Sequence, residues 1–151
     1  MNPPGVLDST LRISERESHL EIQVASGFQA CERAREAVEA LTVDLGPTVR
    51  EHAQILVCEL VTEGVRHASL AAPDAPITLR VDRLPATLRV EVSDHGFGHD
   101  PRRRLDKAYT LSRRGFELVE RLSDAWGIAP GNPTTVWFEI ELDASAQGAI
   151  G

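Results

Sequence analysis

Two neighbouring segments in the middle of the chain, residues 77–82 and 88–93, place an apolar side chain at every second position. Successive side chains of a strand point to opposite faces of a sheet, so each segment presents one face that must be buried. The sequence Leu84-Pro85-Ala86 between them favours a turn. We therefore predict an antiparallel hairpin with one covered face, and other parts of the chain must supply the cover.

A helix upstream of this hairpin is predicted by apolar residues that step by three and four positions from Phe28 to Leu41. Ser26 followed by Gln29 is a variant of the capping box, which marks the start of a helix. We expect this helix to end near residues 45–46, where glycine follows the last apolar residue.

Two further helices are predicted from the same kind of pattern. Thr48 and Glu51 form a second capping box, and a long amphipathic helix is expected over residues 49–68. A third helix is expected to begin around Gly115 and to continue to about Leu122.

The remaining alternating segments predict strands over residues 20–24, 126–128 and 136–142. Helices and strands are grouped along the chain, which favours an α+β fold over a doubly wound one. We predict a two-layer α/β sandwich with a mostly antiparallel mixed sheet and helices on one face. We expect one domain over residues 9–143, with disordered ends over residues 1–8 and 144–151.

The charge of the chain limits its partners. Sixteen basic and 23 acidic residues give a formal net charge of −7, which argues against direct binding of nucleic acid. Basic residues nevertheless crowd into residues 102–114. That stretch indicates either a specific anionic partner or a solvated run of charge, and the run alone does not decide between them.

The cysteines and the hydropathy pattern bear on location. Cys31 and Cys58 fall inside helical patterns, and we interpret them as small buried apolar residues in a reducing compartment. The sequence has no apolar run of membrane-spanning length and no secretory signal at its start. We therefore expect a cytoplasmic protein that does not associate with membranes.

Asp94 is the first candidate functional residue. By its parity it continues the buried face of the strand over residues 88–93, and Gly96 and Gly98 follow it. A buried carboxylate beside a glycine-lined loop is suited to accept hydrogen bonds from the amine of a ligand. The alternative interpretation is an ordinary turn that starts with aspartate and glycine.

Glu59, Glu63 and His67 form a second candidate group, because their spacing of four places them on one stripe of the long helix. We expect this stripe to lie away from the apolar face of the helix. Stacked carboxylates with a histidine can hold a divalent cation, and carboxylates suit Mg²⁺. The alternative interpretation is a solvated face.

Arg113, Arg114 and Gly115 open the third predicted helix. Free backbone N–H groups at a helix start, together with guanidinium groups and a glycine that allows close approach, suit a phosphate. A solvated helix cap is the alternative. Along the chain the carboxylate stripe comes first, then Asp94 with its glycines, then the basic start of the third helix. Taken together in this order, the three candidate groups describe one nucleotide pocket.

Four segments then resemble one known family. Residues 59–68 (ELVTEGVRHA) resemble the N box of the GHKL, or Bergerat-fold, ATPases in the form carried by anti-sigma factor serine kinases. Residues 92–98 (VSDHGFG) resemble the first glycine box of those proteins, and residues 114–127 (RGFELVERLSDAWG) resemble the second. The closing residues 135–140 also fit.

The resemblance implies a role for each matching residue. Glu59 would be the general base for a target serine, and Asp94 would accept from the adenine amino group of ATP. Gly96, Gly98, Arg114 and Gly115 would surround the nucleotide. The implied cofactors are ATP and Mg²⁺. The implied partners are a sigma factor and an anti-anti-sigma protein of the STAS type, and members of the family often form homodimers.

Glu63 departs from the family pattern, because the residue at this position that binds Mg²⁺ in the family is asparagine. Glutamate can ligate Mg²⁺ but adds negative charge beside a triphosphate. Three functions therefore stay open. They are an active serine kinase, a non-catalytic module that binds a partner protein, and the ATP-hydrolysing or sensor-kinase domain of a larger machine.

Overall fold

The computed structural model describes residues 10–13, 18–25, 27, 29–71, 76–94, 111–131 and 133–142. Within these ranges the elements follow one another as β1 (Thr10–Ile13), β2 (Ser18–Val24), α1 (Ala30–Thr42), α2 (Pro47–Ala71), β3 (Ile77–Arg83), β4 (Thr87–Asp94), α4 (Arg113–Leu122), β5 (Ala125–Ala129) and β6 (Thr134–Glu141). The predicted disordered ends, residues 1–8 and 144–151, lie outside the described residues.

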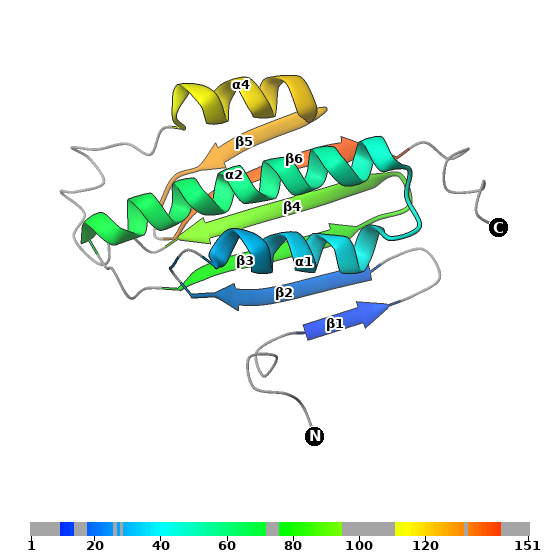
Figure 1. Cartoon of the computed structure of the whole chain (residues 1–151), viewed down its shortest axis with the longest axis horizontal. Coiled ribbons are helices and arrows are strands. Elements are labelled where there is room, and N and C mark those ends of the chain that lie inside the picture. Colours follow the sequence, from blue (N-terminus) through cyan, green and yellow to red (C-terminus); the bar gives the residue numbers. More distant parts are fainter. Residues whose placement is uncertain are drawn as a thin grey trace.

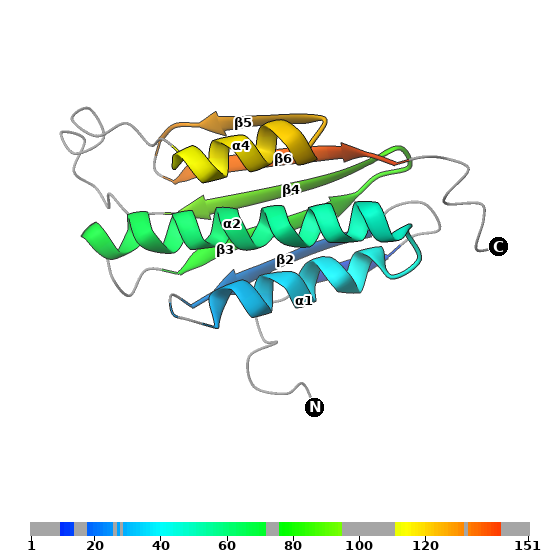
Figure 2. The ribbon, with the colours of Figure 1, turned by 45° about the horizontal axis from the view of Figure 1, so that its top comes forward.

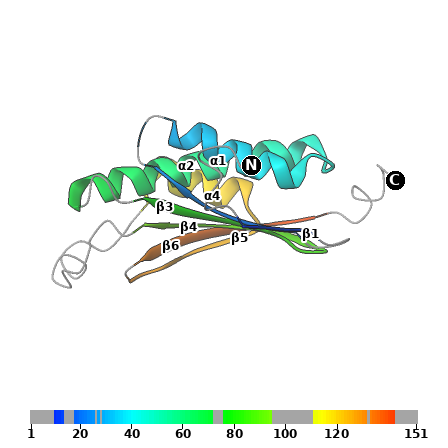
Figure 3. The same ribbon diagram turned by 90° about the horizontal axis from the view of Figure 1, so that it is seen from below.

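The elements form two layers (Figure 1). One layer is a six-stranded sheet in the order β1-β2-β3-β4-β6-β5, and every described strand pair in it is antiparallel. The three labelled helices all cover the same face, as the view from below makes clear (Figure 3). The predicted α+β sandwich with helices on one face is confirmed. Strand β1, which the sequence pattern did not indicate, adds an edge to the sheet.

The predicted hairpin is the centre of the sheet. β3 and β4 pair so that Leu79 lies opposite Val92 and Val81 opposite Val90, and all four side chains are buried against the helices. Helix α2 crosses this row and contacts both neighbouring helices, α1 and α4. Phe138 of β6 is the largest side chain that is fully buried in this core.

The start of α2 differs from the prediction. The helix begins at Pro47 instead of Val49, and the amide of Arg50 donates to the carbonyl of Gly46 at 3.2 Å. Proline is favoured at the first helical position because the N–H that it lacks would have no partner there. Thr48 therefore lies inside the first turn and does not cap it.

The start of α1 also departs from the expected cap. Gln29 directly precedes the helix and makes no capping hydrogen bond through its side chain. Ser26, the predicted partner in the cap, lies outside the described residues. No helix among the described residues has the length and hydrophobicity needed to cross a bilayer.

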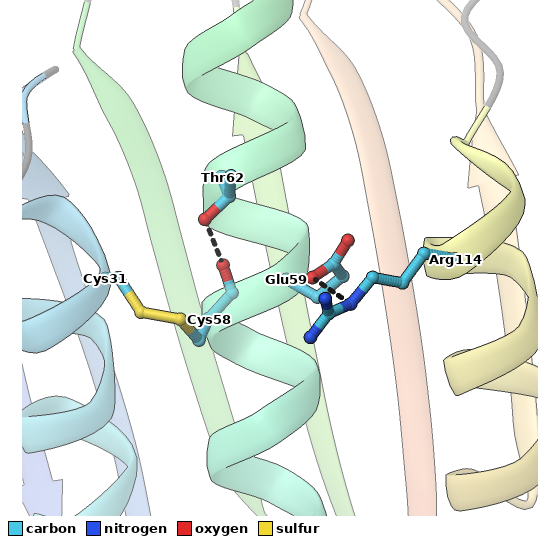
Figure 4. Close-up of a disulfide and its surroundings, with 5 residues drawn as sticks. All are labelled: Cys31, Cys58, Glu59, Thr62 and Arg114. Atoms are coloured by element: carbon cyan, nitrogen blue, oxygen red, sulfur yellow. Dashed lines mark hydrogen bonds and ion pairs between the residues drawn. A yellow bond between two sulfur atoms is a disulfide. The ribbon is translucent and has the colours of Figure 1, made fainter.

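The two cysteines form a disulfide that joins α1 to α2 (Figure 4). The Cα atoms of Cys31 and Cys58 lie 4.7 Å apart, which is within the range that a disulfide spans. Both residues are only partly buried. The prediction of two reduced, buried cysteines is therefore wrong. The helical pattern gave the face on which each cysteine lies, but only the packing of α1 on α2 brings the two faces together.

The sheet face opposite the helices carries a charged cluster around Trp137. Arg89 lies over the Trp137 ring at 4.3 Å from its centroid and donates to Glu139 at 2.8 Å and to Glu91 at 2.9 Å. Partial burial by itself would lower the pKa of Arg89, but the hydrogen bonds to the two glutamates raise it overall. Gly127 completes the cluster, because a Cβ there would lie 2.8 Å from the Trp137 ring.

Candidate functional site

Three elements converge at one end of the molecule. Strand β4 ends, helix α4 begins and the last turns of α2 lie at this same end (Figures 1 and 2). Gly64 of α2 faces the sheet there, and a Cβ on it would lie at ordinary contact distance from Ile77 (3.4 Å) and Val92 (3.6 Å). The fold brings Glu59 and Glu63 of α2 beside the start of α4, and β4 ends at the same end of the molecule.

Asp94 is the last residue of β4, and only 3% of its surface is exposed. It lies in register with Ile77 on one side and with Thr134 on the other. The prediction that this carboxylate lies on the buried face is confirmed. A carboxylate is a hydrogen-bond acceptor, so the Asp94 side chain at the end of the sheet is of the chemical type that a ligand amine can donate to. Gly96 and Gly98 lie outside the described residues.

Glu59 points from α2 toward α4, where the Nε of Arg114 lies 3.7 Å from its carboxylate (Figure 4). The Glu59 side chain is 18% exposed and that of Arg114 is 80% exposed. A pair this exposed on one side contributes little to stability. The carboxylate of Glu59 is therefore partly exposed and is not held by a strong ion pair.

Glu63, one turn further along α2, has a different environment. Only 3% of its side chain is exposed, and its two oxygens have separate partners. One accepts from the backbone N–H of Ser112 at 3.1 Å, and the other is paired with the guanidinium of Arg66. The alternative interpretation of a solvated face is wrong for Glu63, because α4 packs against this side of α2.

The start of α4 is capped by Ser112, a role that the sequence analysis did not assign. Its hydroxyl accepts from the N–H of Gly115 at 3.0 Å. A serine three residues before the amide that it caps is the usual signal for such a cap, so the pattern was present in the sequence. As predicted, the absence of a side chain at Gly115 allows another group to approach the start of α4 closely. The group that lies against it is Glu63, whose oxygen would be 3.1 Å from a Cβ at Gly115.

This geometry does not fit Mg²⁺ at Glu63, because the side chain is only 3% exposed and a cation there would lie beside the guanidinium of Arg66. Among the described residues, no group of three or more His, Cys, Asp or Glu side chains is placed to hold a metal ion. A Mg²⁺ ion bound by Glu63 would also have to be brought into a buried position between two helices. No chemistry is therefore assigned to a metal at this position.

The comparison with known proteins settles the family. The sequence pattern of the histidine kinase-like ATPase domain matches residues 24–140. The chain belongs to this family. The resemblance drawn from the three boxes is thereby confirmed, and the described site lies inside the matched residues.

A solved structure shares the fold. The crystal structure of the RsbU and RsbW domains of Rv1364c from Mycobacterium tuberculosis is similar with a TM-score of 0.63 and 16% sequence identity. The match covers 82% of this chain but only 32% of that one, so the chain spans about a third of the length of that protein. A search of curated proteins gives no significant match.

Proposed function

We propose that this member of the histidine kinase-like ATPase domain family binds ATP at the end of β4 and transfers its terminal phosphoryl group to a serine of an anti-anti-sigma protein of the STAS type. The observation that carries the proposal is the placement of two carboxylates toward the end of the molecule where β4 ends and α4 begins. Asp94 is buried at the end of β4, and Glu59 of α2 faces Arg114 in the first turn of α4. The fold shared with a structure that contains an RsbW domain supports it.

In the proposed reaction the two carboxylates have separate tasks. Asp94 accepts a hydrogen bond from the adenine amino group and thereby sets the orientation of the nucleotide. Glu59 takes the proton of the target serine hydroxyl as that oxygen attacks the terminal phosphorus, and the bond to the bridging oxygen breaks so that ADP leaves. Phosphoryl transfer depends mainly on positioning and charge neutralisation, so few protein groups are needed. Arg114 of α4, which lies beside Glu59, supplies positive charge near the phosphoryl group that is transferred.

The proposed partners follow from the same resemblance. They are a sigma factor, which the domain would sequester, and the STAS-type substrate, with a second copy of the chain as a further candidate partner. A cytoplasmic location is part of this proposal, and the disulfide between Cys31 and Cys58 would be an exception there, since disulfides are rare in that compartment. None of these partners is a nucleic acid, in keeping with the net charge of −7.

The binding of ATP is tested by calorimetric titration of the wild-type chain and of Asp94→Asn. The loss of a hydrogen bond to a charged acceptor weakens binding by roughly tenfold or more. Asp82→Asn is the matched control, because Asp82 lies in β3 on the other face of the sheet, where it pairs with His19. An affinity for ATP that Asp94→Asn leaves unchanged would refute the assignment of the adenine site.

The transfer reaction is tested with radiolabelled ATP and STAS-domain proteins from the same source. Glu59→Gln should lower transfer by roughly a hundredfold or more, since it removes the general base. Glu51→Gln, at an exposed position near the start of the same helix, serves as the control. Equal transfer by Glu59→Gln and wild type would exclude Glu59 as the base.

A second function is favoured by the environment of Glu63. Its carboxylate is hydrogen-bonded to Ser112 and paired with Arg66, which favours a domain that binds a partner protein without using Mg-ATP. Such a module would bind the sigma factor with the same affinity in the presence and absence of ATP. An affinity that changes with ATP would favour the kinase.

A further inference from the structure

The first turn of α4 contains half of a capping box. In a complete box the hydroxyl of the cap residue accepts from the amide three residues later, and a glutamate or glutamine at that later position reaches back to the cap amide. Here the hydroxyl of Ser112 accepts from the amide of Gly115 at 3.0 Å. Gly115 has no side chain with which to complete the box.

Glu63 makes the missing contact from another helix. Its carboxylate accepts from the backbone N–H of Ser112 at 3.1 Å. It reaches that amide across the space beside Gly115, where a Cβ would lie only 3.1 Å from the carboxylate oxygen. The absence of a side chain at Gly115 and the length of the Glu63 side chain therefore fit each other.

The charge of Glu63 is compensated within the protein. A buried carboxylate is costly unless it is paired and hydrogen-bonded. Arg66, one turn along α2, forms the ion pair, and the start of α4 supplies both the N–H donor and the positive end of the helix dipole. This set of partners meets the requirements of a structural anion.

We propose that Glu63 is a positioning residue that completes the capping box of α4 from α2 and does not act as a metal ligand. Its carboxylate fixes the start of α4 on the long helix that also carries Glu59. Asparagine, which is one methylene shorter and neutral, would reach less far toward the Ser112 amide and could not pair with Arg66. The consequence for nucleotide binding, which rests on the proposed function, is that Mg²⁺ gains no ligand from Glu63.

Amide exchange of Ser112 tests the capping role in the full chain, by nuclear magnetic resonance on the isotope-labelled protein. Glu63→Ala should speed the exchange of this amide roughly tenfold or more, because its acceptor is a charged group. Glu63→Gln keeps an acceptor and should give a smaller increase. Glu51→Ala, on an exposed face of α2, is the control and should leave this rate unchanged.

A rescue variant separates capping from general packing. Glu63→Ala combined with Gly115→Gln places the reaching side chain within α4 itself, in the space that Glu63 vacates. We expect the slow exchange of Ser112 to return in this double variant. A Ser112 amide that exchanges at the wild-type rate in Glu63→Ala would overturn the proposal, and so would a double variant that exchanges as fast as Glu63→Ala.

Titration with ATP, in the presence and absence of Mg²⁺, tests the second half of the proposal. We expect Mg²⁺ to change the affinity of the wild type less than about threefold and that of Glu63→Asn by roughly tenfold or more. Addition of Mg-ATP that speeds Ser112 exchange, where ATP alone does not, would show Glu63 moving to the metal and would refute the inference. If no variant binds ATP, the proposed function fails, while the exchange rates still decide the capping role.

Discussion

Loss of the disulfide between Cys31 and Cys58 should have a large effect on stability. The bond closes a loop, because its two cysteines are 27 residues apart in the sequence. In the chain-entropy treatment, closing a loop of about 27 residues in the unfolded state stabilises the native state by about 3.5 kcal/mol at 25 °C. For a domain of this length, a change of this size lowers the melting temperature by roughly 10 °C.

Urea unfolding of the wild type, with and without a thiol reductant, measures this contribution. The count of free thiols by mass spectrometry after alkylation gives the redox state at each step. Cys31→Ser should be as unstable as the reduced wild type, and reductant should not destabilise it further. Val43→Ser is the control, because it changes an exposed residue just beyond α1 and leaves the bond intact.

Two results would refute this reasoning. One is native protein, purified without reductant, in which alkylation finds both cysteines free. The other is a urea midpoint that does not move when both thiols are released. The second result would mean that residual contacts between the α1 and α2 segments already restrict the loop in the unfolded state. It could equally mean that strain of the bond in the native state cancels the entropic stabilisation.

The remaining predictions concern the sheet and one surface pair. Gly127→Ala should destabilise the fold by about 1–3 kcal/mol, because the new Cβ would lie 2.8 Å from the Trp137 ring. Thermal unfolding measures this loss of stability. The double variant Gly127→Ala with Trp137→Leu should recover part of the loss. The hydrogen bond from Arg83 lowers the pKa of Asp44 below its usual range, so the stability that this pair adds is present above the unfolded-state pKa and is lost as pH falls through the folded-state pKa. Asp44→Asn should therefore flatten the acid limb of the stability profile measured by urea unfolding, and an unchanged limb would contradict the assignment.

The sequence determined the strands of the hairpin and the buried position of Asp94 through local rules alone. A period of two places residues 88, 90, 92 and 94 on one face, and the surrounding apolar residues make that face the buried one. The family followed from the boxes around Glu59, Asp94 and Gly115, because their order and spacing along the chain can be recognised without knowledge of the packing.

Strand β1 could not be predicted, because its four residues form an edge strand that gains its order from pairing with β2. The disulfide was missed for a related reason. Helical periodicity gives the face on which Cys31 and Cys58 lie, but not the residues that a neighbouring helix brings opposite them.

Glu63 shows most clearly what the sequence could not decide. Its position on the helix was known from the spacing to Glu59, yet whether a carboxylate there meets water, a metal or another helix depends on the placement of α4. The tertiary structure brings the Ser112 amide to within 3.1 Å of Glu63, from 49 residues along the chain. A contact over that separation is set by the packing of α4 on α2, and no local pattern at either position specifies it.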